Sequence, residues 1–252
     1  MTPRLTVAPF RQHPARFDVP GRRLLSVHFD DVSPKQALDR IAARDPQATF
    51  AYVLAPRPGE LRALERRPEM RRIQKDAWLS LCGNADLRSL AAQRGVSLMP
   101  TTAQDLADLL FERVIKPDTP VTVVGGAPGT VQCLRAKFGL TRLAHCLPPS
   151  GTIRDAISAE ACFQFIRDNP ARFVLICRSS PWQEILAARI AADGRATGLG
   201  LCLGSALDDM AGIRSRIPAW IRSARWDVLR HIAARRTAVV GGSWRKGLAQ
   251  GR

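Results

Sequence analysis

A short polar segment that follows a buried strand carries the residue types best suited to chemistry in this sequence. The segment Ser180-Pro-Trp-Gln-Glu184 comes after the apolar run Phe173–Cys177, which has the composition of a strand covered on both faces. Ser180 is predicted to cap a helix, with Pro181 in its first turn and Gln183 reaching back to the cap. Free N–H groups at such a helix start favour phosphate, and ligands of parallel sheets bind where strands end. An ordinary strand-to-helix connection is the alternative.

A glycine-rich turn, Gly125-Gly-Ala-Pro-Gly129, follows a second apolar run at Val121–Val124. Strand, glycine turn and helix together let the backbone approach a phosphate or a sugar closely. The spacing matches neither the dinucleotide-binding G-x-G-x-x-G pattern nor the P-loop, so the turn alone does not identify a ligand. Asp208 follows a third apolar run, and it is predicted either to border a pocket or, with Asp209, to cap the next helix.

The elements that must position these residues alternate between strands and helices along the chain. Strands are expected at 49–54, 78–82, 96–99, 121–124, 142–147, 173–177 and 198–203. Helices are expected at 34–42, 60–73, 84–94, 102–114, 130–138 and 153–166, and after Pro181. Capping boxes are predicted at Ser33 with Gln36 and at Thr101 with Gln104. This alternation predicts an α/β fold, a Rossmann-like and mainly parallel sheet flanked by helices.

Three regions are expected along the chain. Residues 1–30 are rich in proline and arginine and are predicted to be a partly ordered N-terminal arm. Residues 31–213 form the α/β core, and residues 214–252 form a basic C-terminal helical appendage. No apolar run approaches the roughly 18 residues of a membrane span, and the N-terminus does not resemble a secretory signal. The six cysteines include no C-x-x-C pair, which favours reduced core thiols over a zinc site.

The charge is the strongest compositional signal. The formal net charge is +16, which points to a polyanionic partner: nucleic acid, an anionic membrane surface or a phosphorylated substrate. Aromatic residues are few and are not interleaved with most of the basic ones, which argues against a stacking platform for single-stranded nucleic acid. The exception is the last segment, from Arg214 onward, where Trp220, Trp226 and Trp244 lie among many arginines and one acid, Asp227. That pattern is typical of a membrane-surface element, with a basic helix packed on the core as the alternative.

Taken together, these motifs resemble the WecG/TagA/CpsF glycosyltransferases, especially members that assemble exopolysaccharides. The resemblance is collinear from about residue 49 to about residue 236. It rests on the glycine turn, on 145–151, on the Ser-Pro-x-Gln-Glu segment, on Gly198–Asp208, and on Ala211, Gly212, Arg216, Pro218, Trp220 and Arg222. It implies transfer of a sugar from a nucleotide-sugar donor, usually UDP-linked, to a polyprenyl-diphosphate glycolipid. It also implies inversion at the anomeric carbon without a metal or other cofactor, in a cytoplasmic protein bound peripherally to the inner face of the plasma membrane.

The resemblance also implies a division of roles. The donor would be held by Gly125, Gly126, Pro128, Gly129, Ser180, Pro181, Gln183 and Glu184. Asp208 would border the sugar pocket and take part in catalysis. The lipid diphosphate would be held by Arg216, Trp220 and Arg222, beside an anionic membrane surface. A D-x-D pair that could hold a metal is absent from the sequence, and no nucleic-acid partner is expected because no recognised binding module is present.

One departure from the family's pattern concerns the catalytic base. Gly83 stands where the family carries an aspartate, and Ala55-Pro-Arg57 stands where the family carries Thr-Pro-Asn. Glycine cannot accept a proton from the acceptor hydroxyl. Asp86 is predicted either to substitute as the base or to cap a helix. The alternative to an active transferase is therefore a catalytically impaired homologue that binds nucleotide or a partner transferase.

Overall fold

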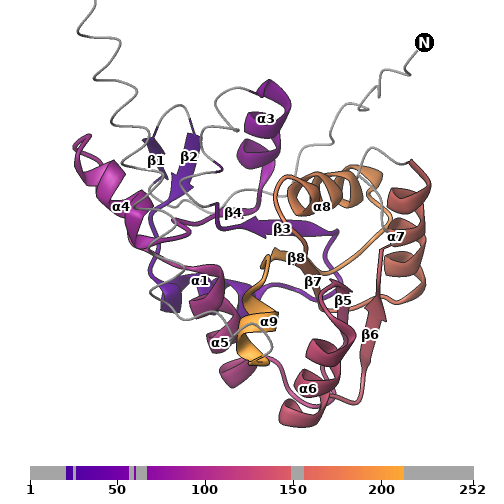
Figure 1. Cartoon of the computed structure of the whole chain (residues 1–252). Helices are drawn as coiled ribbons and strands as arrows, with labels where there is room; N and C mark the ends of the chain where they lie inside the picture. The colour runs from indigo at the N-terminus through magenta and orange to yellow at the C-terminus, as the bar shows by residue number, and fades with distance from the viewer. Residues whose placement is uncertain (1–20, 25–26, 57–59, 61–66, 149–155, 213–252) are drawn as a thin grey trace, which may run out of the picture. The chain divides into compact units, whose positions relative to one another are not determined.

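The described part of the chain is organised around one sheet of six parallel strands (Figure 1). The computed structural model describes residues 21–24, 27–56, 60, 67–148 and 156–212. The strands lie in the order β4-β3-β8-β7-β5-β6 and every neighbouring pair is parallel. Their bounds are β3 Ala51–Leu54, β4 Leu79–Ser80, β5 Val121–Gly125, β6 Leu143–Cys146, β7 Phe173–Cys177 and β8 Leu199–Cys202. The predicted α/β fold class is confirmed.

Helices cover both faces of the sheet, which explains why its central strands are buried throughout. One face packs against α1 Pro34–Ala43, α5 Ala103–Arg113, α6 Pro128–Phe138 and α9 Ala206–Met210. The other face packs against α3 Pro68–Asp76, α4 Ala85–Ala92, α7 Ala156–Asp168 and α8 Trp182–Asp193. Alternate residues of each strand serve the two cores: Leu175 belongs to the first and Ile176 to the second. All five residues of β7 are buried, as its sequence predicts.

The N-terminal hairpin is part of this folded unit. Strands β1 Gly21–Leu24 and β2 Val27–Asp30 pair antiparallel, and Leu24, Val27 and Phe29 are buried in the core that contains α3 and α8. The end of β2 is fastened to the edge strand β4, because the Ser80 N–H donates to Asp30 Oδ2 at 2.7 Å. The described residues of the hairpin, 21–24 and 27–30, therefore pack with the α/β core. Residues 1–20 and 213–252 lie outside the described residues, and the boundaries at 30 and 213 stay predictions.

Three local predictions need correction. Residues 96–99 form no strand; Pro100 only makes a parallel bridge with Cys82. Helix α3 begins at Pro68 because Arg67 is extended, as expected for the residue before a proline. The second capping box joins Thr102 to Asp105, since the Thr101 hydroxyl is buried and donates to the Val32 carbonyl instead. The first capping box, at Ser33 and Gln36, is confirmed. Among the described helices, none is long and apolar enough to cross a membrane.

Candidate active site at the carboxyl edge of the sheet

The candidate site lies where three neighbouring strands, β5, β7 and β8, end on the same edge of the sheet. The turns that follow them are joined by hydrogen bonds. The Gly126 N–H donates to the Cys177 carbonyl at 3.3 Å, and the Gly204 N–H donates to Gln183 Oε1 at 3.0 Å. The fold thus brings together the glycine turn and the Ser-Pro-x-Gln-Glu segment. In open parallel sheets, this edge is where ligands bind.

The glycine turn depends on its first two glycines. Gly125 and Gly126 have φ angles of 85° and 73°, in the left-handed region that L residues rarely adopt. A Cβ atom at Gly125 would lie 2.7 Å from the Cys177 carbonyl oxygen, so β5 and β7 could not approach as closely with any other residue. Helix α6 then begins at Pro128, two residues earlier than predicted, and Ala127 offers no side chain to cap it. The start of α6 therefore depends on other groups for capping.

Asp208, from a distant part of the chain, supplies a capping group for the start of α6. Its Oδ1 accepts a hydrogen bond from the Thr130 hydroxyl at 2.6 Å and lies 3.5 Å from the Ala127 nitrogen. Asp208 therefore does not cap its own helix α9, in which no side-chain cap bond is formed. A carboxylate at a helix N-terminus is stabilised by the helix dipole. The N-terminus of α6 is thus partly capped by an internal carboxylate.

The start of α8 differs from the prediction. The N-cap is Pro181, not Ser180, and the helix runs from Trp182. The Trp182 N–H donates to the Ser179 carbonyl at 3.0 Å and the Ile185 N–H donates to the Pro181 carbonyl at 3.1 Å. The chain therefore turns once before the helix begins, which leaves Ser180 outside it. The Ser180–Pro181 peptide bond is cis.

Gln183 and Glu184 are both buried, each 7% exposed. The Gln183 amide donates through Nε2 to Glu184 Oε1 at 3.1 Å, while its oxygen accepts from Gly204, so it ties α8 to the turn after β8. Glu184 Oε2 is buried without a hydrogen-bond partner among the described residues. Burial raises the pKa of the Glu184 carboxyl to about 7, and Glu60 adds to the rise, whereas hydrogen bonds from Gln183 and Ser180 oppose it. Near neutral pH this carboxyl is therefore balanced between its protonated and ionised forms.

The position of the expected base has no room for a side chain. Gly83 follows β4, and a Cβ atom there would lie 2.3 Å from the Pro56 carbonyl oxygen and 2.4 Å from that of Ala55. Asp86 is exposed in the first turn of α4, and the cap of that helix is Asn84, whose Oδ1 accepts from the Leu87 N–H at 2.8 Å. The reading of Asp86 as the helix cap is wrong. Its role as a substitute base stays a prediction.

Arg178 is a cation at this edge that sequence reasoning missed. It follows β7 directly, its guanidinium lies 5.1 Å from the centre of the Trp182 ring, and its stem lies beside the glycine turn. In the sequence, the available signal for this cation was an arginine immediately after a buried strand.

The predicted acceptor residues Arg216, Trp220 and Arg222 lie outside the described residues. In the described part of the chain, no group of three or more His, Cys, Asp or Glu side chains could hold a metal ion.

The comparison with known protein families agrees with this architecture. A sequence model described as "Glycosyl transferase WecG/TagA/CpsF family" matches residues 22–235 of the 252-residue chain. The match begins within β1, so it includes the N-terminal hairpin as well as the parallel sheet and the carboxyl edge. The family that the sequence motifs resemble is thereby confirmed. This chain belongs to the WecG/TagA/CpsF family of glycosyltransferases.

Proposed function

We propose that this protein transfers a sugar from a UDP-sugar to a polyprenyl-diphosphate glycolipid during exopolysaccharide or other cell-surface polysaccharide biosynthesis. The observation that carries the proposal is the carboxyl edge, where the glycine turn, the start of α6 and Arg178 meet in a member of a glycosyltransferase family. Backbone N–H groups and an arginine are the groups that can receive a diphosphate without a metal ion. These residues would hold the donor.

The proposed reaction is an inverting displacement. The acceptor hydroxyl attacks the anomeric carbon on the face opposite the bond to UDP, the new glycosidic bond forms, and the bond to the diphosphate breaks with its electron pair. Negative charge then grows on the departing diphosphate, where the N-terminus of α6 and Arg178 would stabilise it. Asp208 would modulate the charge of this anion site, because its carboxylate accepts a hydrogen bond from the Thr130 hydroxyl and lies against the Ala127 nitrogen. The acceptor hydroxyl must lose its proton to a base, for which Asp86 is the proposed candidate.

UDP is expected to raise the melting temperature of the full chain in the presence of EDTA. At a ligand concentration of 100 times Kd, binding stabilises the folded state by about 2.7 kcal/mol, which a thermal melt readily detects. Uridine lacks the diphosphate and serves as the matched control, so it should give a much smaller shift. The donor-site proposal fails if no nucleoside diphosphate shifts the melt, or if EDTA abolishes the shift.

The acceptor side is proposed to lie in the C-terminal segment, through Arg216, Trp220 and Arg222, with the protein attached peripherally to the inner membrane face. Each arginine near an anionic surface contributes about 1 kcal/mol, and this contribution is screened by salt. Cosedimentation should therefore be stronger with anionic than with neutral liposomes, and weaker for a chain that ends near residue 234. Equal binding to both lipids, or undiminished binding after truncation, would assign the segment to another partner.

A second candidate function is supported by Gly83. The carbonyl oxygens of Ala55 and Pro56 fill the place of a side chain at this position. A homologue without the family's base could still bind nucleotide, or a partner transferase, while transferring sugar slowly. Loss of a general base commonly lowers rates by about 10²–10⁴-fold. The two candidates separate when UDP binding and sugar transfer are measured on the same preparation: the impaired homologue binds but does not transfer.

A further inference from the structure

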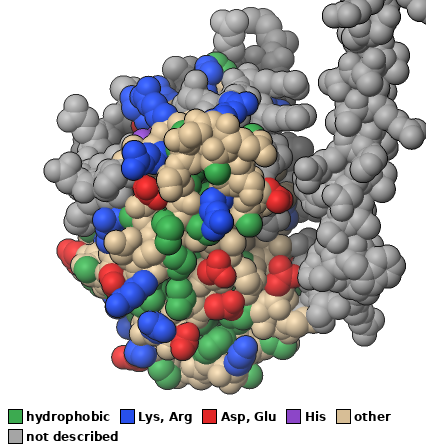
Figure 2. Space-filling model, turned by 90° about the vertical axis from the view of Figure 1, so that its left-hand side faces the viewer, with side chains coloured by type: hydrophobic (Ala, Val, Ile, Leu, Met, Phe, Trp, Pro, Cys, Tyr) green, Lys and Arg blue, Asp and Glu red, His purple; other side chains and the backbone are tan. Residues whose placement is uncertain are grey.

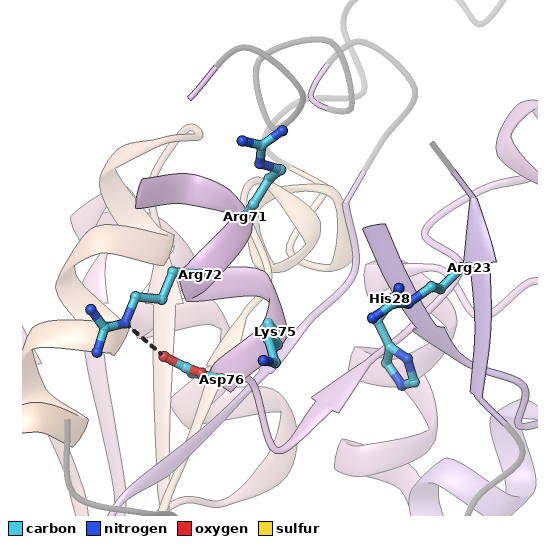
Figure 3. Close-up of a pocket in the computed structure, with 6 residues that line it drawn as sticks. All are labelled: Arg23, His28, Arg71, Arg72, Lys75 and Asp76. Atoms are coloured by element: carbon cyan, nitrogen blue, oxygen red, sulfur yellow. Dashed lines mark ion pairs between the residues drawn. The ribbon is translucent and has the colours of Figure 1, made fainter. Parts of the chain in front are cut away.

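A basic pocket lies between the N-terminal hairpin and α3. Its volume is about 550 Å³, and it is lined by Arg23, His28, Arg71, Arg72, Lys75 and Asp76 (Figure 3). The hairpin contributes the first two residues and α3 the other four. In Figure 3, Arg72 points away from the hairpin and toward Asp76. None of the residues predicted to hold the donor lines this pocket. In the space-filling view, basic side chains gather near the top of the described surface, whereas lower down basic and acidic side chains are interspersed (Figure 2).

The lining carries four cationic side chains and a single carboxylate. That carboxylate, Asp76, pairs with Arg72 at 3.7 Å. Arg23 and Lys75 are exposed, and neither makes an ion pair with a carboxylate among the described residues. A concave surface with unpaired cations raises the local concentration of anions. The pocket therefore offers two cations, Arg23 and Lys75, that make no ion pair with a described carboxylate.

The walls of the pocket are held in place by buried and partly buried hydrogen bonds. On the hairpin side, the Ser80 hydroxyl donates to the His28 carbonyl at 2.8 Å, and Asp30 accepts from the Ser80 N–H at 2.7 Å. On the helix side, the Tyr52 hydroxyl donates to the Ile73 carbonyl at 2.7 Å. His28 Nε2 lies 3.2 Å from Asp30 Oδ1, which orients the imidazole from within the protein. The separation between the hairpin and α3 is thus fixed by the paired strands β3 and β4 before any ligand arrives.

We propose that this pocket binds a phosphate-bearing anion at a site separate from the donor site. Arginine presents a planar fork that matches two phosphate oxygens, and lysine adds a compact charge, so their mixture suits a phosphate better than a lone carboxylate. A cavity of about 550 Å³ is larger than a single phosphate needs, so it can accept a diphosphate or a phospholipid headgroup. The proposal depends on neither the donor nor the acceptor assigned above.

The test uses the full chain and the double variant Arg23→Gln/Lys75→Gln. The matched control is Arg94→Gln/Lys116→Gln, which removes the same charge at two exposed cations outside the pocket. Affinity for inorganic pyrophosphate is measured by calorimetry for the three proteins. The pocket variant is expected to bind pyrophosphate at least tenfold more weakly than the wild type, while the control stays within about twofold. Any pyrophosphate that binds the donor site contributes equally to all three proteins.

Binding to vesicles of phosphatidylglycerol and of phosphatidylcholine then shows whether the phosphate belongs to a lipid headgroup or to a soluble molecule. If the pocket takes a lipid headgroup, binding to phosphatidylglycerol vesicles falls in the pocket variant by about fivefold for each lost cation, with no matching fall in the control. If it takes a soluble phosphate, pyrophosphate affinity falls and vesicle binding is unchanged. The proposal is overturned if the pocket variant binds pyrophosphate as tightly as the wild type, or if both variants lose affinity equally.

Discussion

Gly83→Asp is expected to destabilise the protein and not to restore rapid sugar transfer. The new Cβ atom would meet two backbone carbonyl oxygens at 2.3 and 2.4 Å, and backbone cannot move aside as a flexible side chain can. Overpacking of this kind typically costs about 1–3 kcal/mol. The structure therefore gives an aspartate no room at this position. Chemical unfolding and a transfer assay, performed on the same preparation, measure both effects.

Two further variants separate sterics from charge. Gly83→Ala adds the same Cβ atom without a carboxylate, so it should be destabilised to a similar degree. Ala85→Asp adds a carboxylate to an exposed position at the start of α4, where the helix dipole favours it, so its stability should be close to that of the wild type. If Gly83→Asp unfolds at the wild-type denaturant concentration and transfers sugar faster, the segment after β3 opens to admit the aspartate, contrary to this account.

Glu184→Gln is expected to remove a pH dependence from the free energy of unfolding. The folded-state pKa of Glu184, about 7, lies above its ordinary value of 4.5, so between these values the folded state holds a proton that the unfolded state has lost. Stability contributed by the protonated form is therefore complete below about pH 4.5 and is lost as the pH rises through 7. At about 1.4 kcal/mol per pH unit, this interval of about 2.5 units corresponds to roughly 3.5 kcal/mol as an upper bound.

The measurement is the free energy of unfolding in urea at pH 5 and at pH 8, for the wild type and the variant. Glutamine cannot ionise and its oxygen can still accept from the Gln183 amide, so the variant should lose less stability than the wild type over this range. Glu69→Gln, at an exposed position in the first turn of α3, is the control and should follow the wild type. Equal pH dependence in Glu184→Gln and the wild type would show that the buried carboxyl does not titrate near neutrality.

The fold could be predicted wherever an apolar run is long enough to indicate a buried strand. All five residues of β7 are buried because helices cover both sides of the strand, and the sequence FVLIC is sufficient to indicate this. The hairpin at 21–30 was missed because β1 buries only Leu24 and exposes the three residues before it, so it shows no alternation. Thr101 and Thr102 are equal candidates for a cap by type, and the tertiary contact of Thr101 with Val32 decides between them.

The candidate site was predictable in its location and less so in its chemistry. The glycine turn and the Ser-Pro-x-Gln-Glu segment lie at the same edge of the sheet, because parallel strands place their carboxyl ends together. The bond from Thr130 to Asp208 joins residues 78 positions apart, and no local pattern could indicate it. Likewise, the space for a side chain at Gly83 is filled by the carbonyl groups of Ala55 and Pro56, which follow strand β3. The basic pocket arises only when the hairpin and α3 are brought together.

Transfer of a labelled sugar to a lipid acceptor tests whether this protein is the proposed glycosyltransferase. The full chain is incubated in EDTA with a panel of labelled UDP-sugars and with polyprenyl-diphosphate glycolipids, and label in the lipid fraction is measured. One donor is expected to label the lipid, with the anomeric configuration inverted. If every donor leaves the lipid unlabelled although UDP still stabilises the protein against heat, the chain is not a transferase of this kind.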